Sequence, residues 1–142
     1  MIVYKDKLEI ENLLRKNGYR VTKGRVELLA FLKNKKIPLS ISDIRRDMAR
    51  SIDKVTLYRA LEDFSKSKIV YKVNLHSTAS YYEYIHTDHH HHHIVCEKCG
   101  SIEDIANCNQ DTLQKNILKH SKSFNTINTH SLEFFGICKK CS

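Results

Sequence analysis

The sequence predicts an α+β fold, with a helical first part, a two-stranded hairpin, and a smaller second part that combines strands with one helix. Helix-like segments fill the first half, whereas short β-prone runs separated by turn residues dominate after it. Residues 1–75 hold 18 Lys and Arg against nine Asp and Glu, but residues 76–142 hold six against seven. All nine histidines and all five cysteines fall in the second segment. We therefore expect two domains, 1–86 and 87–142.

The first two helices have clear boundary signals. Residues 6–18 place apolar residues at helical spacing and stop at Gly18, because glycine readily takes the left-handed conformation that ends a helix. The second helix follows Thr22, whose hydroxyl is suited to cap it, and lies before the break at Pro38, the only proline. Its apolar stripe consists of Val26, Leu29 and Leu32.

Two further helices are expected after the proline. The third is short and starts after Ser42, or after Ser40 if it begins earlier, since either hydroxyl could cap it. Asp53 is the expected cap of the fourth helix, which covers 54–68. The apolar seam of the fourth helix, spaced i, i+4 and i+7, consists of Leu57, Leu61 and Phe64.

Two strands, 69–74 and 80–85, follow the fourth helix and are joined by a short turn. Short helices followed by a hairpin are the order of a winged helix-turn-helix domain, whose last helix before the wing enters the major groove of DNA. There Arg59 would donate to a base or a phosphate, and Tyr58 would offer its ring to a thymine methyl. The alternative is that Tyr58 belongs to the core and Arg59 is a solvated charge. The positive charge favours nucleic acid as a partner, with solubility as the other explanation.

Two Cys-x-x-Cys pairs lie in the second half, Cys96 with Cys99 and Cys138 with Cys141. Two intervening residues let both thiolates of a pair reach one ion, and two pairs complete a tetrahedral zinc site. A reducing compartment keeps such thiols free for metal. The alternatives are a redox dithiol and unpaired buried thiols. A closed four-thiolate site has no position for a substrate, so it favours an architectural role.

Five consecutive histidines, 89–93, precede the first cysteine pair. If this segment is a strand, the odd-numbered side chains face one way and the even-numbered ones the other, so one strand could serve two sites. Nearby residues that could add ligands are Glu83, Glu103, Asp104, Asp111 and His130. Mixed imidazole and carboxylate ligation suits Zn, Fe(II), Mn, Ni or Co. The alternative is a solvated or partly buried histidine strand.

Between the cysteine pairs, the sequence predicts a strand over 100–107, a helix over 109–123 and a long strand over 124–138. The residues of this helix expected to face inward are Leu113, Ile117 and Leu118. Together these elements predict a small α/β domain of the kind that mediates dimerisation, with its last strand leading directly into the second cysteine pair.

Four segments carry a resemblance to a known family: "GYRVTKGRVELL" (18–29), "KVTLYRALEDF" (54–64), "HHHHHIVCEKCGSIED" (89–104) and "HSLEFFGICKKC" (130–141). In order and spacing, the chain resembles the ferric uptake regulator family of metal-dependent repressors over nearly its whole length. The resemblance implies a homodimer. Metal binding at the hinge between the two halves would close the DNA-binding domains onto an AT-rich palindromic operator.

The resemblance also implies site residues. The structural zinc site would consist of Cys96, Cys99, Cys138 and Cys141. The regulatory site would consist of His91 and His93 with the carboxylates of Glu83 and Asp104, and a second, weaker site of His90, His92, Asp111 and His130. The DNA-reading positions would be Thr56, Tyr58 and Arg59, with Arg20 approaching the minor groove.

The chain departs from the family pattern at the regulatory site. Many relatives supply a histidine from the DNA-binding half, where this chain has Pro38. The candidates to replace that ligand are His76, His86 and Cys108. Cys108 has the alternative of a small buried residue at a helix start. The spacing from Glu83 to His91 is slightly longer than usual, and His92 stands where an aspartate is common.

These features predict a metal-responsive DNA-binding repressor of metal-uptake or metal-homeostasis genes, and not an enzyme. The expected cofactors are a structural Zn2+ and a regulatory divalent metal, Zn2+ or Fe2+ first and Mn2+ or Ni2+ next. The alternative is a zinc-storage or metal-delivery protein without specific DNA binding. A metallohydrolase is disfavoured because the sequence has no His-Glu-x-x-His or nucleophile motif. Without a signal peptide or a long apolar run, we expect a cytoplasmic protein with no membrane partner and no small organic substrate.

Overall fold

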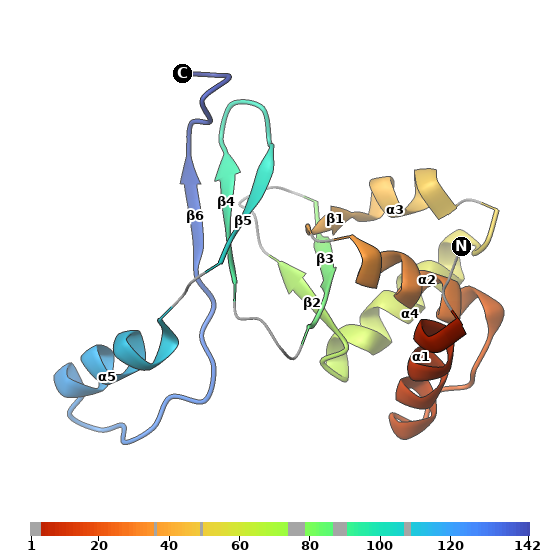
Figure 1. The fold of residues 1–142 in the computed structure, drawn as a ribbon, viewed down its shortest axis with the longest axis horizontal. Coiled ribbons are helices and arrows are strands. Elements are labelled where there is room, and N and C mark those ends of the chain that lie inside the picture. Colours follow the sequence, from red (N-terminus) through yellow and green to blue (C-terminus); the bar gives the residue numbers. More distant parts are fainter. Residues whose placement is uncertain (1–3, 36, 49, 74–78, 87–90, 107–108) are drawn as a thin grey trace. The chain divides into compact units, whose positions relative to one another are not determined.

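The computed structural model describes residues 4–35, 37–48, 50–73, 79–86, 91–106 and 109–142. The chain divides into two compact units, Met1–His86 and Thr87–Ser142 (Figure 1). The first unit is mainly helical with a small sheet, and the second combines a three-stranded sheet with one helix. The α+β class expected from the sequence is therefore confirmed. No helix in the described ranges has the length and apolar character needed to cross a membrane.

The first unit contains four helices and three strands in its described part. The helices are α1 (Tyr4–Lys16), α2 (Lys23–Asn34), α3 (Ile41–Met48) and α4 (Lys54–Lys66). The strands are β1 (Leu39–Ser40), β2 (Val70–Val73) and β3 (Tyr81–Tyr84), paired antiparallel in the order β1-β3-β2. This is the element order of a winged helix, with α3 and α4 as the helix-turn-helix pair and β2 and β3 as the wing.

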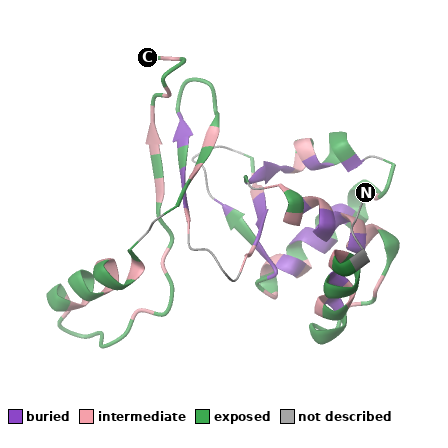
Figure 2. Cartoon of the chain, in the orientation of Figure 1, coloured by how far each residue is buried: buried purple, intermediate pink, exposed green. Residues whose placement is uncertain are grey.

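Apolar side chains from all four helices and from the three strands form the core of the first unit (Figure 2). The predicted seam of α4, Leu57, Leu61 and Phe64, is fully buried in it. Tyr19 packs its ring edge against Phe64, with the centroids 5.6 Å apart, and its hydroxyl donates to the carbonyl of Asp63 at 2.8 Å. Each buried large apolar side chain contributes about 1.5–3 kcal/mol. This packing determines which side of α4 stays exposed.

Three predicted helix boundaries are confirmed. Gly18 follows α1 with a φ of +75°, in the left-handed region that glycine adopts without strain. At the start of α2 the backbone N–H of Arg25 donates to Thr22 Oγ1 at 3.4 Å. At the start of α4 the backbone N–H of Thr56 donates to Asp53 Oδ1 at 3.0 Å. Each cap satisfies a donor that the first turn of a helix leaves without an intrahelical acceptor.

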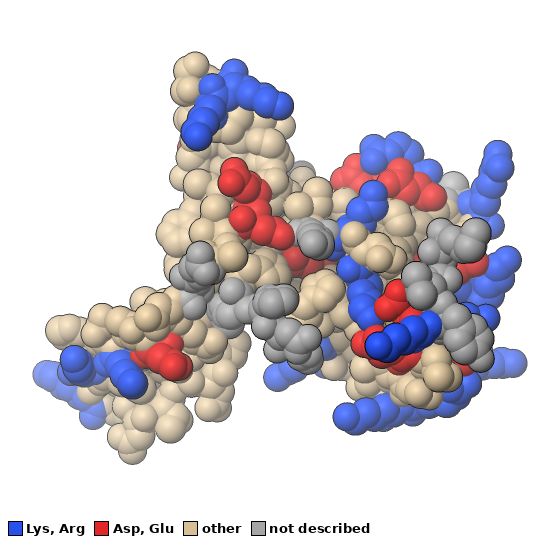
Figure 3. All heavy atoms as spheres, viewed as in Figure 1, with Lys and Arg blue, Asp and Glu red and all other residues tan. Residues whose placement is uncertain are grey.

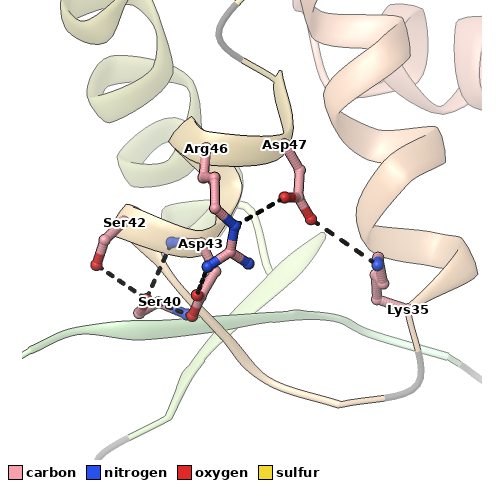
Figure 4. A network of polar contacts seen from close by, with 6 residues as sticks. All are labelled: Lys35, Ser40, Ser42, Asp43, Arg46 and Asp47. Atoms are coloured by element: carbon pink, nitrogen blue, oxygen red, sulfur yellow. Dashed lines mark hydrogen bonds and ion pairs between the residues drawn. The ribbon is translucent and has the colours of Figure 1, made fainter.

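The start of α3 distinguishes between its two candidate caps. The helix begins at Ile41, and the backbone N–H of Asp43 donates to Ser40 Oγ at 3.1 Å (Figure 4). In return, the N–H and the hydroxyl of Ser40 both donate to the Asp43 carboxylate. Ser40 is therefore the cap, whereas Ser42 lies in the first turn with its hydroxyl 3.1 Å from that of Ser40. The Ser40 hydroxyl is the main cause that holds the pKa of Asp43 below its ordinary value.

The wing pairs as the sequence predicts, with one addition. β2 and β3 pair from Val70 opposite Tyr84 to Val73 opposite Tyr81, and the segment between them, 74–78, lies outside the described residues. The two-residue strand β1 joins the free edge of β3. We did not predict β1, because two residues are too few to show strand periodicity.

The second unit has a three-stranded sheet and one helix among its described residues. The elements are β4 (His92–Cys96), β5 (Ile102–Ile105), α5 (Gln110–His120) and β6 (Glu133–Gly136). The strand order is β5-β4-β6, with β4 antiparallel to β5 and parallel to β6. The strand expected over 89–96 begins at His92 in the part that the structure describes.

Two expectations for the second unit are wrong. The long strand over 124–138 shrinks to β6, because only four residues find a partner on β4 and the Asn, Thr and Ser before them offer no alternating apolar face. The expected inward face of α5 is also not buried within the chain. Ile117 is 50% exposed, and Leu113 and Leu118 are only half-buried. α5 therefore keeps an apolar side that the described residues do not cover.

Candidate metal centres and DNA-facing surface

Four cysteines from two turns lie together in the second unit. Because β4 and β6 are parallel neighbours, with Cys96 opposite Gly136, both strands end at the same edge of the sheet. One cysteine pair follows from each strand. The sulfur atoms of Cys96, Cys99, Cys138 and Cys141 all lie within 4.8 Å of one another. The sequence spacing predicts this grouping, and none of the four forms a disulfide.

Each pair lies in a tight turn, and the two turns are linked. The N–H of Gly100 donates to the Cys96 carbonyl at 2.8 Å, with Gly100 at a φ of +72° that favours glycine. In the matching turn, the N–H of Cys141 donates to the Cys138 carbonyl at 2.9 Å. Between the turns, the N–H of Cys138 donates to the Cys96 sulfur at 3.3 Å, and the Lys98 ammonium donates to the Cys141 carbonyl at 2.9 Å.

The four thiols differ in acidity. Backbone N–H donors, first that of Cys138 and then that of Cys99, lower the pKa of Cys96 to about 6. Hydrogen bonding with the Ser101 hydroxyl is the main cause that lowers the pKa of Cys99. Hydrogen bonding with Cys138 and then with Cys99 raises the pKa of Cys141 to about 12. Four thiolates this close repel one another unless a cation lies among them, so the donor set fits a thiophilic divalent ion such as Zn2+.

Two histidines and an aspartate form a second group of ligand types on the same sheet. His93 on β4 is opposite Asp104 on β5, so both side chains leave the same face. His93 Nε2 lies 3.5 Å from Asp104 Oδ1, and the ring centroids of His91 and His93 are 5.1 Å apart. One ligand atom of each residue lies within 4.8 Å of the others. His93 is buried, whereas the Asp104 side chain is 31% exposed. This donor set fits Zn, Fe(II), Mn or Ni.

His92, between His91 and His93 in the sequence, lies on the other face of the sheet. The ring centroid of His92 is 5.2 Å from that of His130 and 6.2 Å from that of Phe134 on β6. The side chains of His92 and His93 therefore lie on opposite faces of the sheet, as the alternation along a strand predicts. Asp111 is exposed in the first turn of α5. In the described ranges no group of three or more ligand atoms includes His92 and His130.

The remaining candidate ligands divide into two sets. Glu83 is buried on β3, in the first unit. His86 follows β3, with its ring centroid 5.1 Å from that of Tyr84, and belongs to no group of ligand atoms found among the described residues. The candidates that lie outside the described residues are His76, His90 and Cys108.

α4 presents its predicted DNA-reading residues to solvent. Thr56 and Arg59 are exposed, and Tyr58 is 45% exposed, so the alternative that places Tyr58 in the core is wrong. Arg20, between α1 and α2, is also exposed. Neither Arg20 nor Arg59 takes part in an ion pair with another described residue. In Figure 3, Lys and Arg are spread over the visible face of the first unit, with Asp and Glu among them.

Arg25 supports this surface and was not predicted. Its guanidinium donates to the carbonyl of Arg20 at 3.1 Å, lies 5.5 Å from the centroid of the Tyr19 ring, and is 3.6 Å from the Asp63 carboxylate. These contacts hold the backbone at Arg20 in place. In the sequence, an arginine in the first turn of a helix looks like any solvated charge, so no local signal indicates this role.

Residues 16–135 match the ferric uptake regulator family. Over 141 residues the chain is 30% identical to the ferric uptake regulation protein of Bacillus subtilis, covering 94% of this chain and 92% of that protein. The ferric uptake regulator of Helicobacter pylori has the same fold, with a TM-score of 0.78 at 24% identity over 98% of this chain and 93% of that one. The regulator from Francisella tularensis, solved with iron, gives a TM-score of 0.71 at 32% identity over 87% and 95% of the two chains.

The family match spans α2 to β6 and ends before Cys138, so it does not include the second cysteine pair. The grouping of all four cysteines is instead shown by the geometry of this chain. The matched residues include the winged helix, the histidine strand and the first cysteine pair. On this match, and on the extended identity to the Bacillus subtilis regulator, the chain belongs to the ferric uptake regulator family, whose members are transcription regulators and not enzymes.

Proposed function

We propose that the chain is a metal-activated, DNA-binding repressor of metal-uptake or metal-homeostasis genes. The observation that carries this proposal is the grouping of His91 and His93, at the start of the strand that leads into the four-cysteine cluster, with Asp104 on the neighbouring strand β5. Two donor sets of different hardness on one sheet favour two tasks, one structural and one regulatory. Thr56, Tyr58 and Arg59, exposed on α4, give the chain a surface for DNA, which a zinc-storage or metal-delivery protein would not require.

The structural task belongs to the thiolates. Cys96, Cys99, Cys138 and Cys141 would hold one Zn2+, which supplies a cross-link between the ends of β4 and β6 and contributes to folding free energy. The close approach of the four sulfurs and the hydrogen bonds between the turns support this assignment.

The regulatory task belongs to the mixed site. His91 and His93 would contribute imidazole nitrogens and Asp104 a carboxylate, and we include Glu83 as a further ligand because the family resemblance implies it. The metal would be Zn2+ or Fe2+, with Mn2+ and Ni2+ as further candidates, and the iron in the Francisella tularensis relative supports Fe2+. A weaker second site would use His90, His92, Asp111 and His130. The residues left as substitutes for the missing family histidine are His76, His86 and Cys108.

DNA recognition belongs to the first unit, as the DNA-binding domain, and dimerisation to the second. Thr56, Tyr58 and Arg59 would read bases in the major groove, and Arg20 would approach the minor groove of an AT-rich palindrome. A two-fold operator requires a protein dimer, so we propose a cytoplasmic homodimer. Metal would strengthen DNA binding to the extent that the DNA-competent arrangement holds it more tightly than the alternative does.

The test is DNA selection under defined metal conditions. The full-length protein would select duplexes from a random pool with Fe2+, Zn2+, Mn2+ or Ni2+, and again with chelator. We expect a palindromic AT-rich duplex to be enriched only when metal is present. The His93→Ala variant should lose metal activation and keep its structural zinc, because a nitrogen ligand is removed from one site only.

His120→Ala is the matched control for this experiment, since His120 is exposed at the end of α5 and belongs to neither donor set. It should behave as the wild type. Equal binding with metal and with chelator would contradict metal activation. Failure to enrich any duplex, with both metal sites filled, would instead favour the storage or delivery function.

A further inference from the structure

A surface hollow of about 320 Å3 lies where α3, α4 and the start of β3 meet. Its lining residues are Ile41, Ser42, Arg45, Tyr58, Ala79 and Ser80. None of them is acidic. One is a guanidinium, and three carry hydroxyl groups. A hollow with one cation, several hydroxyls and no carboxylate in its lining is suited to an anion.

Two adjacent arginines on α3 differ in how their charge is used. Arg46 lies 3.1 Å from Asp43 and 3.1 Å from Asp47, so its charge is compensated by two carboxylates (Figure 4). Asp47 also lies 4.0 Å from the ammonium of Lys35. Arg45 is exposed and forms no ion pair with any residue in the described ranges. Asp43 and Asp47 therefore compensate the charges of Arg46 and Lys35, and the charge of Arg45 remains available at the hollow.

The hydroxyl groups around Arg45 are not equivalent. The hydroxyl of Ser42 lies 3.1 Å from that of Ser40, which is already engaged with Asp43, so Ser42 has a partner inside the chain. Ser80 is half-buried at the start of the wing strand, and no hydrogen bond of its hydroxyl is found within the described part of the chain. The third hydroxyl, that of Tyr58, belongs to the residues proposed above to read bases, so Ser80 is the remaining hydroxyl that could donate to an anion together with Arg45.

We propose that this hollow binds a DNA backbone phosphate, with Arg45 supplying the charge and Ser80 a hydrogen bond. The inference rests on the proposed DNA binding and adds a contact outside the base-reading residues. In a helix-turn-helix domain the first helix of the pair crosses the phosphate backbone while the second enters the groove. A phosphate held between α3 and the wing would fix the depth and register of α4, and would carry no sequence information itself.

The test compares Arg45→Ala with Arg46→Ala in the full-length, metal-loaded protein. Both variants remove one positive charge from adjacent positions of α3. Binding would be measured across a salt series on two probes, the duplex enriched by selection and a duplex of arbitrary sequence. Arg45→Ala should reduce the slope of log affinity against log salt by about 1, and weaken binding roughly five- to tenfold at 0.1 M salt on both duplexes. Arg46→Ala should leave the slope unchanged.

Two further measurements separate the remaining explanations. Ser80→Ala should weaken binding to both duplexes without changing the salt slope, because it removes a hydrogen bond and no charge. Inorganic phosphate titrated into the protein without DNA tests the other source of this ligand, and Arg45-dependent binding of free phosphate with no change in the DNA salt slope of Arg45→Ala would overturn the proposal in favour of a small-anion site. Equal slopes for Arg45→Ala and Arg46→Ala would also overturn it. If the wild type binds neither duplex, the proposed function fails first.

Discussion

The sulfur atoms of the four-cysteine cluster show how single residues prepare a cation site. Cys96, with a pKa near 6, receives backbone donors, whereas Cys141, with a pKa near 12, is surrounded by other thiols. A cation among the sulfurs would remove this difference in protonation, since a thiol that coordinates a metal is deprotonated outright and all four cysteines would bind as thiolates. The group of His91, His93 and Asp104 differs from this cluster, because it contains no thiol that must lose a proton before it can bind a metal.

Replacing one ligand tests the structural site. Cys138→Ser should lose the tightly held zinc, about one ion per chain, and should melt at a lower temperature because metal binding contributes to folding. Metal content by mass spectrometry and thermal unfolding would measure both effects. Lys140→Ala, which changes an exposed residue of the same turn and removes no sulfur ligand, is the control. Full zinc content and unchanged melting in Cys138→Ser would rule out the four-cysteine assignment.

Arg59 tests base reading on α4. If its guanidinium makes a bidentate contact to a base, Arg59→Ala should weaken binding to the selected duplex by about 1–3 kcal/mol and relax the sequence preference. Lys66→Ala on the same helix is the control, because its ammonium already lies 3.3 Å from Glu62. An equal loss on selected and arbitrary duplexes would identify Arg59 as a phosphate contact instead.

At the scale of an element, α3 depends on reciprocal bonds at its first turn. Ser40 ends β1 and caps α3, so a single side chain joins the sheet to the helix-turn-helix pair. The carboxylate of Asp43 serves both Ser40 and Arg46. The orientation of α3, and with it the position of Arg45, therefore follows from a few polar contacts at the surface of the first unit.

Removing this cap should cost stability in a pH-dependent way. Ser40→Ala should lower the free energy of unfolding by about 1 kcal/mol at pH 7, as loss of an N-cap typically does. The folded pKa of Asp43 is lowered, so its contribution is present above the ordinary value of 3.8 and is lost as the pH falls through the folded pKa. Denaturant unfolding would measure the free energy of unfolding of both proteins at pH 7 and below pH 3.8, and the difference between Ser40→Ala and the wild type should be smaller at the lower pH. Ser42→Ala is the control, and an equal loss in both variants would contradict the assignment of Ser40.

At the scale of the whole molecule, the sequence predicts local features better than pairings. Thr22, Asp53 and Gly18 act within one turn of chain, and all three were predicted at the correct residue. β1 and the length of β6 depend on partner strands distant in the sequence, so periodicity alone missed the first and overextended the second. The cysteine cluster was predictable because ligand spacing is a chemical constraint. The contact of Arg25 with Arg20 has no comparable signature.

The uncovered apolar side of α5 predicts how two copies associate. Ile117 is 50% exposed, and no residue of this helix is buried within the described chain. If a second copy covers this side, burial of Ile117 stabilises the dimer by about 1 kcal/mol per protomer, and Ile117→Asp removes that contribution. Because a two-fold interface contains the residue twice, the loss is about 2 kcal/mol per dimer. The dimer dissociation constant should then rise at least roughly 30-fold. Asn116→Asp introduces the same charge at the adjacent exposed position and should leave the dimer intact. Sedimentation across a concentration series would measure both, and an unchanged dimer in Ile117→Asp would remove α5 from the interface.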